Sequence, residues 1–265
     1  MPGDKVRLRF TKTGTLRLLS HHDLMRSFER MLRRADLPFK STAGFHPGPR
    51  VVFALSLPLG VVGREEVVEI EFTRELDAAD VLARLRAQAP AGLDFTRATL
   101  VPMKATAVPR CVVYRMVLPP ESAAPVAARC RELLAEPKVW VDRLRPSPKK
   151  LNIRPYLRDL RVTPAGEGHA LELDLWVTQT GSARAEELLK LVGVSHLTDE
   201  GYLVERTTLE VRDETPEHDP ADVPPDGPAD TQRLDPAAAA ALARREEEQP
   251  AAAGWGASPP GPVVE

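Results

Sequence analysis

Cysteine is scarce in this sequence, and its scarcity limits the chemistry that the chain can carry. The 265 residues include two cysteines, Cys111 and Cys130. A pair this isolated supplies neither a disulfide framework nor the clustered spacing of a Cys-rich metal site. We therefore expect two small buried thiols that fill space in the core.

Long apolar runs are also missing. No run approaches the roughly 18 residues that a membrane span requires. The opening residues, MPGDKVRLRF, lack the apolar core of a signal peptide. Aromatic residues make up 5% of the chain, although the apolar share of 43% is ordinary for a globular protein. These features predict a soluble, cytoplasmic protein.

The charge is small overall but unevenly distributed. Residues 213–265 contain twelve acidic and three basic side chains, which leaves 33 basic and 26 acidic side chains before them. A basic body with an acidic tail can indicate a polyanionic partner. An arginine-rich surface that is merely solvated explains the same numbers, and the charge count alone does not separate the two.

The first hundred residues predict alternating strands and helices. Residues 5–10, KVRLRF, alternate apolar with basic side chains, which indicates a half-buried strand with a basic outer face. Ser20, with Asp23 three residues later, resembles a capping box and predicts a helix that ends before Pro38. Further strands are expected at 50–57, 66–72 and 93–101, and a second helix at 77–89. This order is that of a ferredoxin-like βαββαβ unit.

A looser copy of the same order follows from residue 111. We therefore predict an α+β fold of tandem ferredoxin-like (βαββαβ) halves, with antiparallel sheets and helices on one face. The predicted domains are residues 1–104 and 105–212. Residues 213–265 are rich in proline, alanine and acidic residues, which predicts a disordered tail with at most a short helix at 237–243.

The start of the first helix is a candidate anion site. Early N–H groups of a helix lack partners within it, and the helix dipole makes that end positive. Ser20, His21 and His22 lie there, although Ser20 alone explains a simple cap. If the chain after the helix returns extended, the loop at 44–49 reaches the helix start. Its candidate residues are Gly44, Phe45, His46 and Arg50.

These histidines have no spacing typical of metal ligands, so we expect no metal site. A histidine can also act as a general acid or base. An RNA-cleaving or other hydrolytic enzyme that uses His21, His22 or His46 is therefore an alternative, although no nucleophile and base pair is recognisable.

Two basic clusters favour contact with nucleic acid. The first is on the predicted helix, at Arg26, Arg30 and Arg33. The second includes Lys149, Lys150 and Arg154, with Tyr156 among them. Cationic side chains displace counterions from phosphates, and an aromatic ring can stack on a base. The same cations are also typical of a strand edge that is protected from aggregation.

Two stretches resemble the motifs of a known family. They are SHHDLMRSFERMLRRADLPFKSTAGFHPGPRVVFALSLPLGVVGREEVVEIEF, from Ser20, and KKLNIRPYLRDLRV, at 149–162. Both are similar to the radical-SAM-linked family of unknown function DUF2344, over residues 3–212. The resemblance implies a radical SAM enzyme as partner. This chain has no CxxxCxxC motif, so the partner would carry the [4Fe–4S] cluster and S-adenosylmethionine.

The resemblance brings no established activity and no catalytic residues. It points to an accessory binding module, and the basic surface suggests RNA, such as tRNA or rRNA, as the substrate that the module presents. We also expect that the acidic tail can fold over the basic face and compete with RNA. The remaining alternative is a protein-interaction adaptor that binds no nucleic acid and meets an acidic partner surface.

Overall fold

The computed structural model describes residues 3–43, 45, 47–144, 147–166, 168–214 and 229–248. The N-terminal part consists of β1 (Lys5–Lys12), η1 (Gly14–Leu18), α1 (His21–Arg34), β2 (Val51–Phe53), β3 (Val62–Glu71), α2 (Ala78–Gln88) and β4 (Leu93–Val101). The C-terminal part begins with β5 (Pro109–Leu118), α3 (Pro120–Ala135), β6 (Trp140–Arg143), β7 (Lys149–Asn152), η2 (Arg154–Tyr156), β8 (Leu157–Ala165) and β9 (Gly168–Thr178). It continues with β10 (Gly181–Ser182), α4 (Ala185–Leu191), η3 (Ser195–Thr198), β11 (Val204–Val211), β12 (Thr231–Arg233) and α5 (Pro236–Glu248).

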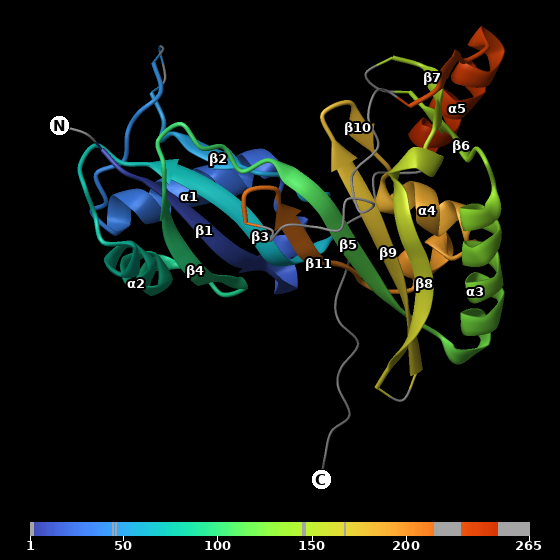
Figure 1. Cartoon of the computed structure of the whole chain (residues 1–265), viewed down its shortest axis with the longest axis horizontal. Helices are drawn as coiled ribbons and strands as arrows, with labels where there is room; N and C mark the ends of the chain where they lie inside the picture. Colours follow the sequence, from blue (N-terminus) through green and yellow to red (C-terminus); the bar gives the residue numbers. More distant parts are fainter. Residues whose placement is uncertain are drawn as a thin grey trace.

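These elements form a mixed α+β fold with one large, mostly antiparallel sheet (Figure 1). Its strand order is β10-β9-β5-β11-β3-β1-β4, while β2 adds to β3 and β8 adds to β9. Within the described part of the chain, the one parallel pairing joins β11 to β3 through Glu205 opposite Val62 and Arg206 opposite Gly63. A single continuous sheet therefore connects the N-terminal and C-terminal parts.

Successive side chains of β1 alternate between the two faces of the N-terminal part of the sheet. Val6, Leu8 and Phe10 are buried on the face that α1 and α2 cover. The predicted apolar stripe of α1 packs against them, and the ring centroids of Phe28 and Phe10 lie 5.4 Å apart. The predicted helix at 20–37 and its buried face are therefore confirmed.

The C-terminal part has its own hydrophobic core. The buried face of α3 packs on β8 and β9 and includes Val126, Cys130 and Leu133. Cys111, on β5, is buried as well, and both thiols are free. The prediction of two buried thiols is confirmed. Burial raises the pKa of Cys130 to about 11.

A second, three-stranded sheet has the order β12-β7-β6. β12 lies within the predicted disordered tail, and Gln232 pairs with Lys150 of β7. Leu234, next to β12, is buried, and α5 follows it. The sequence TQR of β12 has no apolar alternation, so local pattern did not reveal this strand. The predicted domain boundaries stay a prediction.

Among the described residues, no helix is long and apolar enough to cross a membrane.

Candidate nucleic-acid interface

The start of α1 is organised by Ser20. Its hydroxyl oxygen accepts a hydrogen bond from the Asp23 backbone N–H at 3.2 Å and donates one to the Asp23 carboxylate at 2.7 Å. This confirms Ser20 as the N-cap. His21 and His22 are exposed beside it, and the ring of His21 lies edge-on to Phe53 at 5.3 Å. The end of the helix is open to solvent, where an anion has access.

Arginines on α1 form an outward basic face. The side chains of Arg26 and Arg33 are 70% and 58% exposed, and Arg30 between them is exposed too. Arg26 lies 3.5 Å from Asp23, and Arg33 lies 2.8 Å from Glu29. Exposed pairs of this kind are weak, about 0.2–1 kcal/mol, so these arginines can exchange partners for a ligand.

The loop after α1 is anchored away from the helix start. The Lys40 N–H donates to the Glu71 carbonyl, and the guanidinium of Arg50 lies 3.1 Å from the Glu71 carboxylate. Glu71 pairs with Lys5, whereas α1 begins after the opposite end of β1. The loop base and the helix start therefore lie at opposite ends of β1.

Phe45, near the tip of that loop, is fully exposed. The predicted approach of His46 to His21 and His22 falls outside the described residues, as does Gly44.

Tyr156 does not serve as a stacking platform. Its side chain is 1% exposed and belongs to the core of the C-terminal part. The prediction that its ring meets a base is wrong, because η2 turns the ring inward. Arg154 is also engaged: its guanidinium donates to the Leu134 carbonyl at 2.8 Å and to the Leu157 carbonyl at 3.2 Å.

Other arginines of the second cluster also bond within the protein. Arg143 donates to the Glu187 carboxylate at 2.6 Å, and Arg158 donates to the Asp174 carboxylate at 3.1 Å. Of the predicted site residues in this cluster, Lys150 is exposed on β7 and Lys149 is half-buried. The structure does not bring them to α1, since the two elements lie at opposite ends of the molecule (Figure 1).

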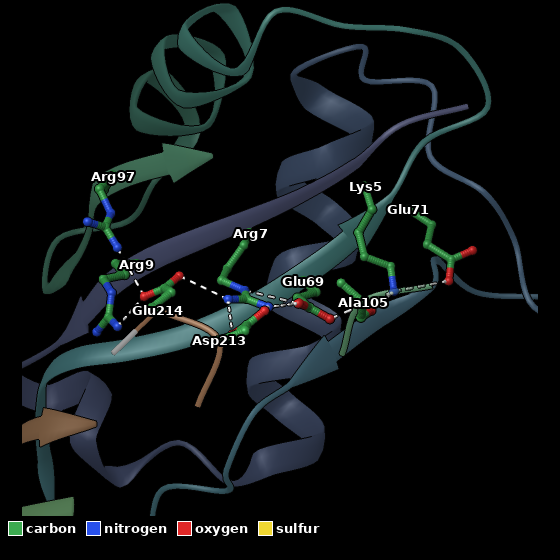
Figure 2. A network of polar contacts seen from close by, with 9 residues as sticks. All are labelled: Lys5, Arg7, Arg9, Glu69, Glu71, Arg97, Ala105, Asp213 and Glu214. Atoms are coloured by element: carbon green, nitrogen blue, oxygen red, sulfur yellow. Dashed lines mark hydrogen bonds and ion pairs between the residues drawn. The ribbon is translucent and has the colours of Figure 1, made fainter. Parts of the chain in front are cut away.

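The basic outer face predicted for β1 is largely covered. The side chain of Arg7 is 2% exposed because Glu69 and the Asp213–Glu214 segment enclose its guanidinium (Figure 2). Lys5, also buried, donates to the Ala105 carbonyl at 2.7 Å. The predicted strand is confirmed, but it is buried on both faces, so the prediction that it is half-buried with its basic side facing solvent is wrong.

Glu214 connects three arginines of this covered face. Its carboxylate accepts from Arg9 at 2.6 Å, from Arg97 at 3.0 Å and from Arg7 at 3.1 Å. Burial alone would raise the pKa of Glu214, but the hydrogen bonds from Arg9 and Arg7 outweigh it and lower the pKa. The hydrogen bond from Arg7 likewise lowers the pKa of Asp213.

Sequence analysis did not select Arg7, Arg9 or Arg97 as site residues. Arg9 and Arg97 are 88 positions apart, and they meet because β1 pairs with β4. A charge pattern along the chain contains no signal for such a meeting. The one hint in the sequence is the change from a basic body to an acidic tail at residue 213.

The junction of the two parts buries another ion pair. Arg206 is fully buried, donates to both carboxylate oxygens of Glu66, and also donates to the Leu55 carbonyl at 3.1 Å. Burial alone would lower the pKa of Arg206, but the Glu66 charge raises it above its ordinary value. The guanidinium is therefore charged at every accessible pH, and the pair forms a joint between β3 and β11.

A mainly apolar cavity of about 590 Å³ lies beside this joint, and its lining includes Leu55, Tyr114, Leu189 and Tyr202. Among the described residues, none of the predicted site residues lines it. The described residues also contain no cluster of three or more His, Cys, Asp or Glu side chains that could hold a metal ion.

Fold and surface together define an α+β protein with a continuous, mostly antiparallel sheet and cationic residues on separate elements. More specifically, the chain belongs to the family described as "Uncharacterized protein conserved in bacteria (DUF2344)", whose family model matches residues 5–187. A comparison with curated proteins found no match.

The solved structures that the comparison matched include that of an unknown protein from Galdieria sulphuraria. It aligns at 10% sequence identity and a TM-score of 0.25, over 79% of this chain and 99% of that chain. A similarity this weak carries no conclusion about the fold or function of the present chain.

Proposed function

We propose that the chain is an accessory binding module that presents an RNA substrate, such as tRNA or rRNA, to a radical SAM enzyme. The observation that carries the proposal is the arginine face of α1. Arg26, Arg30 and Arg33 are exposed on one surface helix, and their partners Asp23 and Glu29 hold them only weakly. Three such cations offer about three phosphate contacts.

The start of the same helix adds to this surface. His21 and His22 are exposed beside the Ser20 cap, where the helix dipole favours an anion. Lys149 and Lys150 form a second contact on β7, at the other end of the molecule. A long polyanion can touch both ends, whereas a small anion cannot, and this favours RNA over a nucleotide.

The radical SAM partner is part of the same proposal and rests on the resemblance of the two sequence motifs. The sequence has no CxxxCxxC motif, so the partner would hold both the [4Fe–4S] cluster and S-adenosylmethionine. The chain itself would then position the substrate and perform no chemistry. A cytoplasmic location fits this role.

The finer fold proposal is that the two parts are tandem ferredoxin-like halves. Two neighbouring sets of strands support it, β4-β1-β3-β2 and β11-β5-β9-β8. Each set is antiparallel throughout, and each has the connection order strand, helix, strand, strand, helix, strand, apart from the β6–β7 hairpin inserted in the second.

The direct test is the salt dependence of binding to a fluorescently labelled bulk tRNA, followed by anisotropy between 50 and 200 mM salt. We expect R26Q/R30Q/R33Q to weaken binding and to reduce the slope of log K against log salt by about three. Glutamine keeps the helix propensity of arginine, so α1 should still form.

The matched control is R74Q/R131Q/K190Q, which removes the same charge from three exposed positions on other elements. In this control, the slope of log K against log salt should differ from the wild-type slope by no more than about one. The proposal is overturned if the wild-type protein does not bind at 50 mM salt, or if both triple variants behave alike. Cleavage of the tRNA that disappears in H21A/H22A would instead indicate the hydrolytic alternative.

A further inference from the structure

Three arginines meet on the face of the sheet that α1 and α2 do not cover. Arg7 and Arg9 come from β1, and Arg97 comes from β4, directly opposite Arg9 in the strand register. Like charges opposite each other on neighbouring strands destabilise a sheet. An anion beside the three arginines therefore stabilises this arrangement.

The anion present is the dipeptide Asp213–Glu214, which begins two residues beyond Val211, the last residue of β11 (Figure 2). Asp213 accepts from Arg7 through both carboxylate oxygens, at 2.7 and 2.8 Å. Glu214 accepts from Arg7, Arg9 and Arg97. Two adjacent carboxylates thus accept the hydrogen bonds that the guanidinium groups could otherwise donate to phosphate oxygens.

We propose that Arg7, Arg9 and Arg97 form a binding site for the phosphodiester backbone of RNA, which Asp213 and Glu214 occupy as internal competing ligands. This inference rests on the proposed function, because it names RNA as the competitor. Binding of RNA at this site displaces the Asp213–Glu214 dipeptide. The dipeptide in turn limits binding to RNA molecules that supply several phosphates at once.

The arginines would keep internal partners after displacement. Arg7 also donates to the Glu69 carboxylate at 2.8 and 3.0 Å, and Arg9 donates to the Leu209 carbonyl at 3.2 Å. The strand face therefore remains partly neutralised when the dipeptide leaves. Arg9 also pairs with Glu65 at 3.6 Å, while Glu69 lies 3.8 Å from Lys5 as well. Glu65 and Glu69 together do not balance all three arginines, so an external anion is still favoured.

The dipeptide is also accessible. The side chains of Asp213 and Glu214 are 47% and 20% exposed, and a depression of about 410 Å³ opens beside Glu214. Its lining includes Arg9, Arg97 and Thr96, together with the acidic Glu65 and Glu210, which oppose an incoming anion. RNA can therefore approach the arginines from this side, at a cost that keeps the site selective for multivalent anions.

The sequence directly beyond Glu214 is acidic as well. Residues 215–228 contain four acidic side chains, Glu217, Asp219, Asp222 and Asp226, and no lysine or arginine. Truncation after Arg212 would test the competition poorly, because it also removes α5 and β12, and β12 pairs with β7. Point variants separate the two effects.

The test variant is D213N/E214Q, measured by the same tRNA anisotropy. We expect this variant to bind tRNA about tenfold more tightly, which is an ordinary size for the coupling between two competing ligands. We also expect the slope of log K against log salt to be steeper than that of the wild type by about two. The matched control is D199N/E200Q, an exposed Asp–Glu dipeptide elsewhere on the surface. It removes the same charge and should raise affinity by less than about twofold.

Adding R97Q to D213N/E214Q should remove most of the gain, since Arg97 lies at the open edge of the site. If the double variant is poorly folded by circular dichroism, E214Q alone serves, because it leaves the Asp213–Arg7 pair in place. Hydrogen exchange gives a second readout: the Glu214 N–H bonds the Val211 carbonyl at 3.1 Å and should lose protection when RNA binds.

The outcomes separate this inference from the proposed function. If the wild type binds RNA through α1 while D213N/E214Q gains no more than D199N/E200Q, the inference fails and the function stands. If only D213N/E214Q binds, and R97Q abolishes that binding, the inference stands and the role of α1 fails. If no form binds at 50 mM salt, both are overturned.

Discussion

At the scale of single residues, this protein buries more charge than its sequence suggests. Arg206 with Glu66, and Arg7 with Glu69, are ion pairs between strands with side chains at most 3% exposed. Removing one partner of a buried pair leaves an uncompensated charge, which costs far more than the pair itself contributes. Arg206 and Glu66, which contact no proposed ligand, are therefore candidates for a structural role.

The Arg206–Glu66 pair offers the sharpest test of this view. Glu66→Gln should lower the free energy of unfolding by about 3–5 kcal/mol, because the buried guanidinium loses its counter-charge. The change is measured by urea unfolding at pH 7. The matched control is Glu205→Gln, which breaks the pair with half-exposed Arg64 and should cost at most about 1 kcal/mol. Equal losses in the two variants would contradict the buried-charge explanation.

At the scale of elements, α1 carries both the cap and the basic face. Ser20→Ala should lower the free energy of unfolding by about 1 kcal/mol, since the Asp23 N–H loses its acceptor. Ser20→Asn should retain most of the stability, because an amide oxygen also caps a helix. Ser27→Ala, in the middle of the same helix, is the control and should be neutral or slightly stabilising. A cost for Ser27→Ala equal to that for Ser20→Ala would refute the role of the cap.

Most elements were predictable because their signals are local. The apolar stripe and the cap of α1, the Asp77 cap of α2 and the alternation of β1 depend on neighbours within a few positions. β2 was predicted too long, at 50–57, because the apolar residues that follow Phe53 pack in the connection to β3. β12 was missed because its stability comes from its pairing with β7, which no local pattern records.

At the scale of the whole molecule, the candidate site depended on contacts that the sequence does not reveal. The exposed arginines of α1 were predicted, since helical periodicity separates the apolar from the basic face. The burial of Tyr156 and the engagement of Arg154 follow from the turn at η2. The three-arginine face required strand pairing and a contact across 206 positions, from Arg7 to Asp213.

That long-range contact should be visible in the acid stability of the protein. Asp213 and Glu214 have a lower pKa in the folded chain than their ordinary values of 3.8 and 4.5. A depressed folded pKa contributes stability above the ordinary pKa and loses it as pH falls through the folded value. Between about pH 5 and pH 3, D213N/E214Q should therefore lose less stability than the wild type, by about 1 kcal/mol after allowance for solvent screening of the half-exposed Asp213.

The measurement is urea unfolding at pH 7, 5, 4 and 3, with D199N/E200Q as the control that should follow the wild type. At pH 7 the double variant should be the less stable protein, since Arg7, Arg9 and Arg97 lose their charged partner. The two stability curves should then approach each other as pH falls below the ordinary pKa values of 3.8 and 4.5, because the unfolded wild-type chain takes up protons there before the folded chain does. Curves that stay parallel from pH 7 to pH 3 would show that the dipeptide is not bound to the arginines in solution, and the competition with RNA would lose its basis.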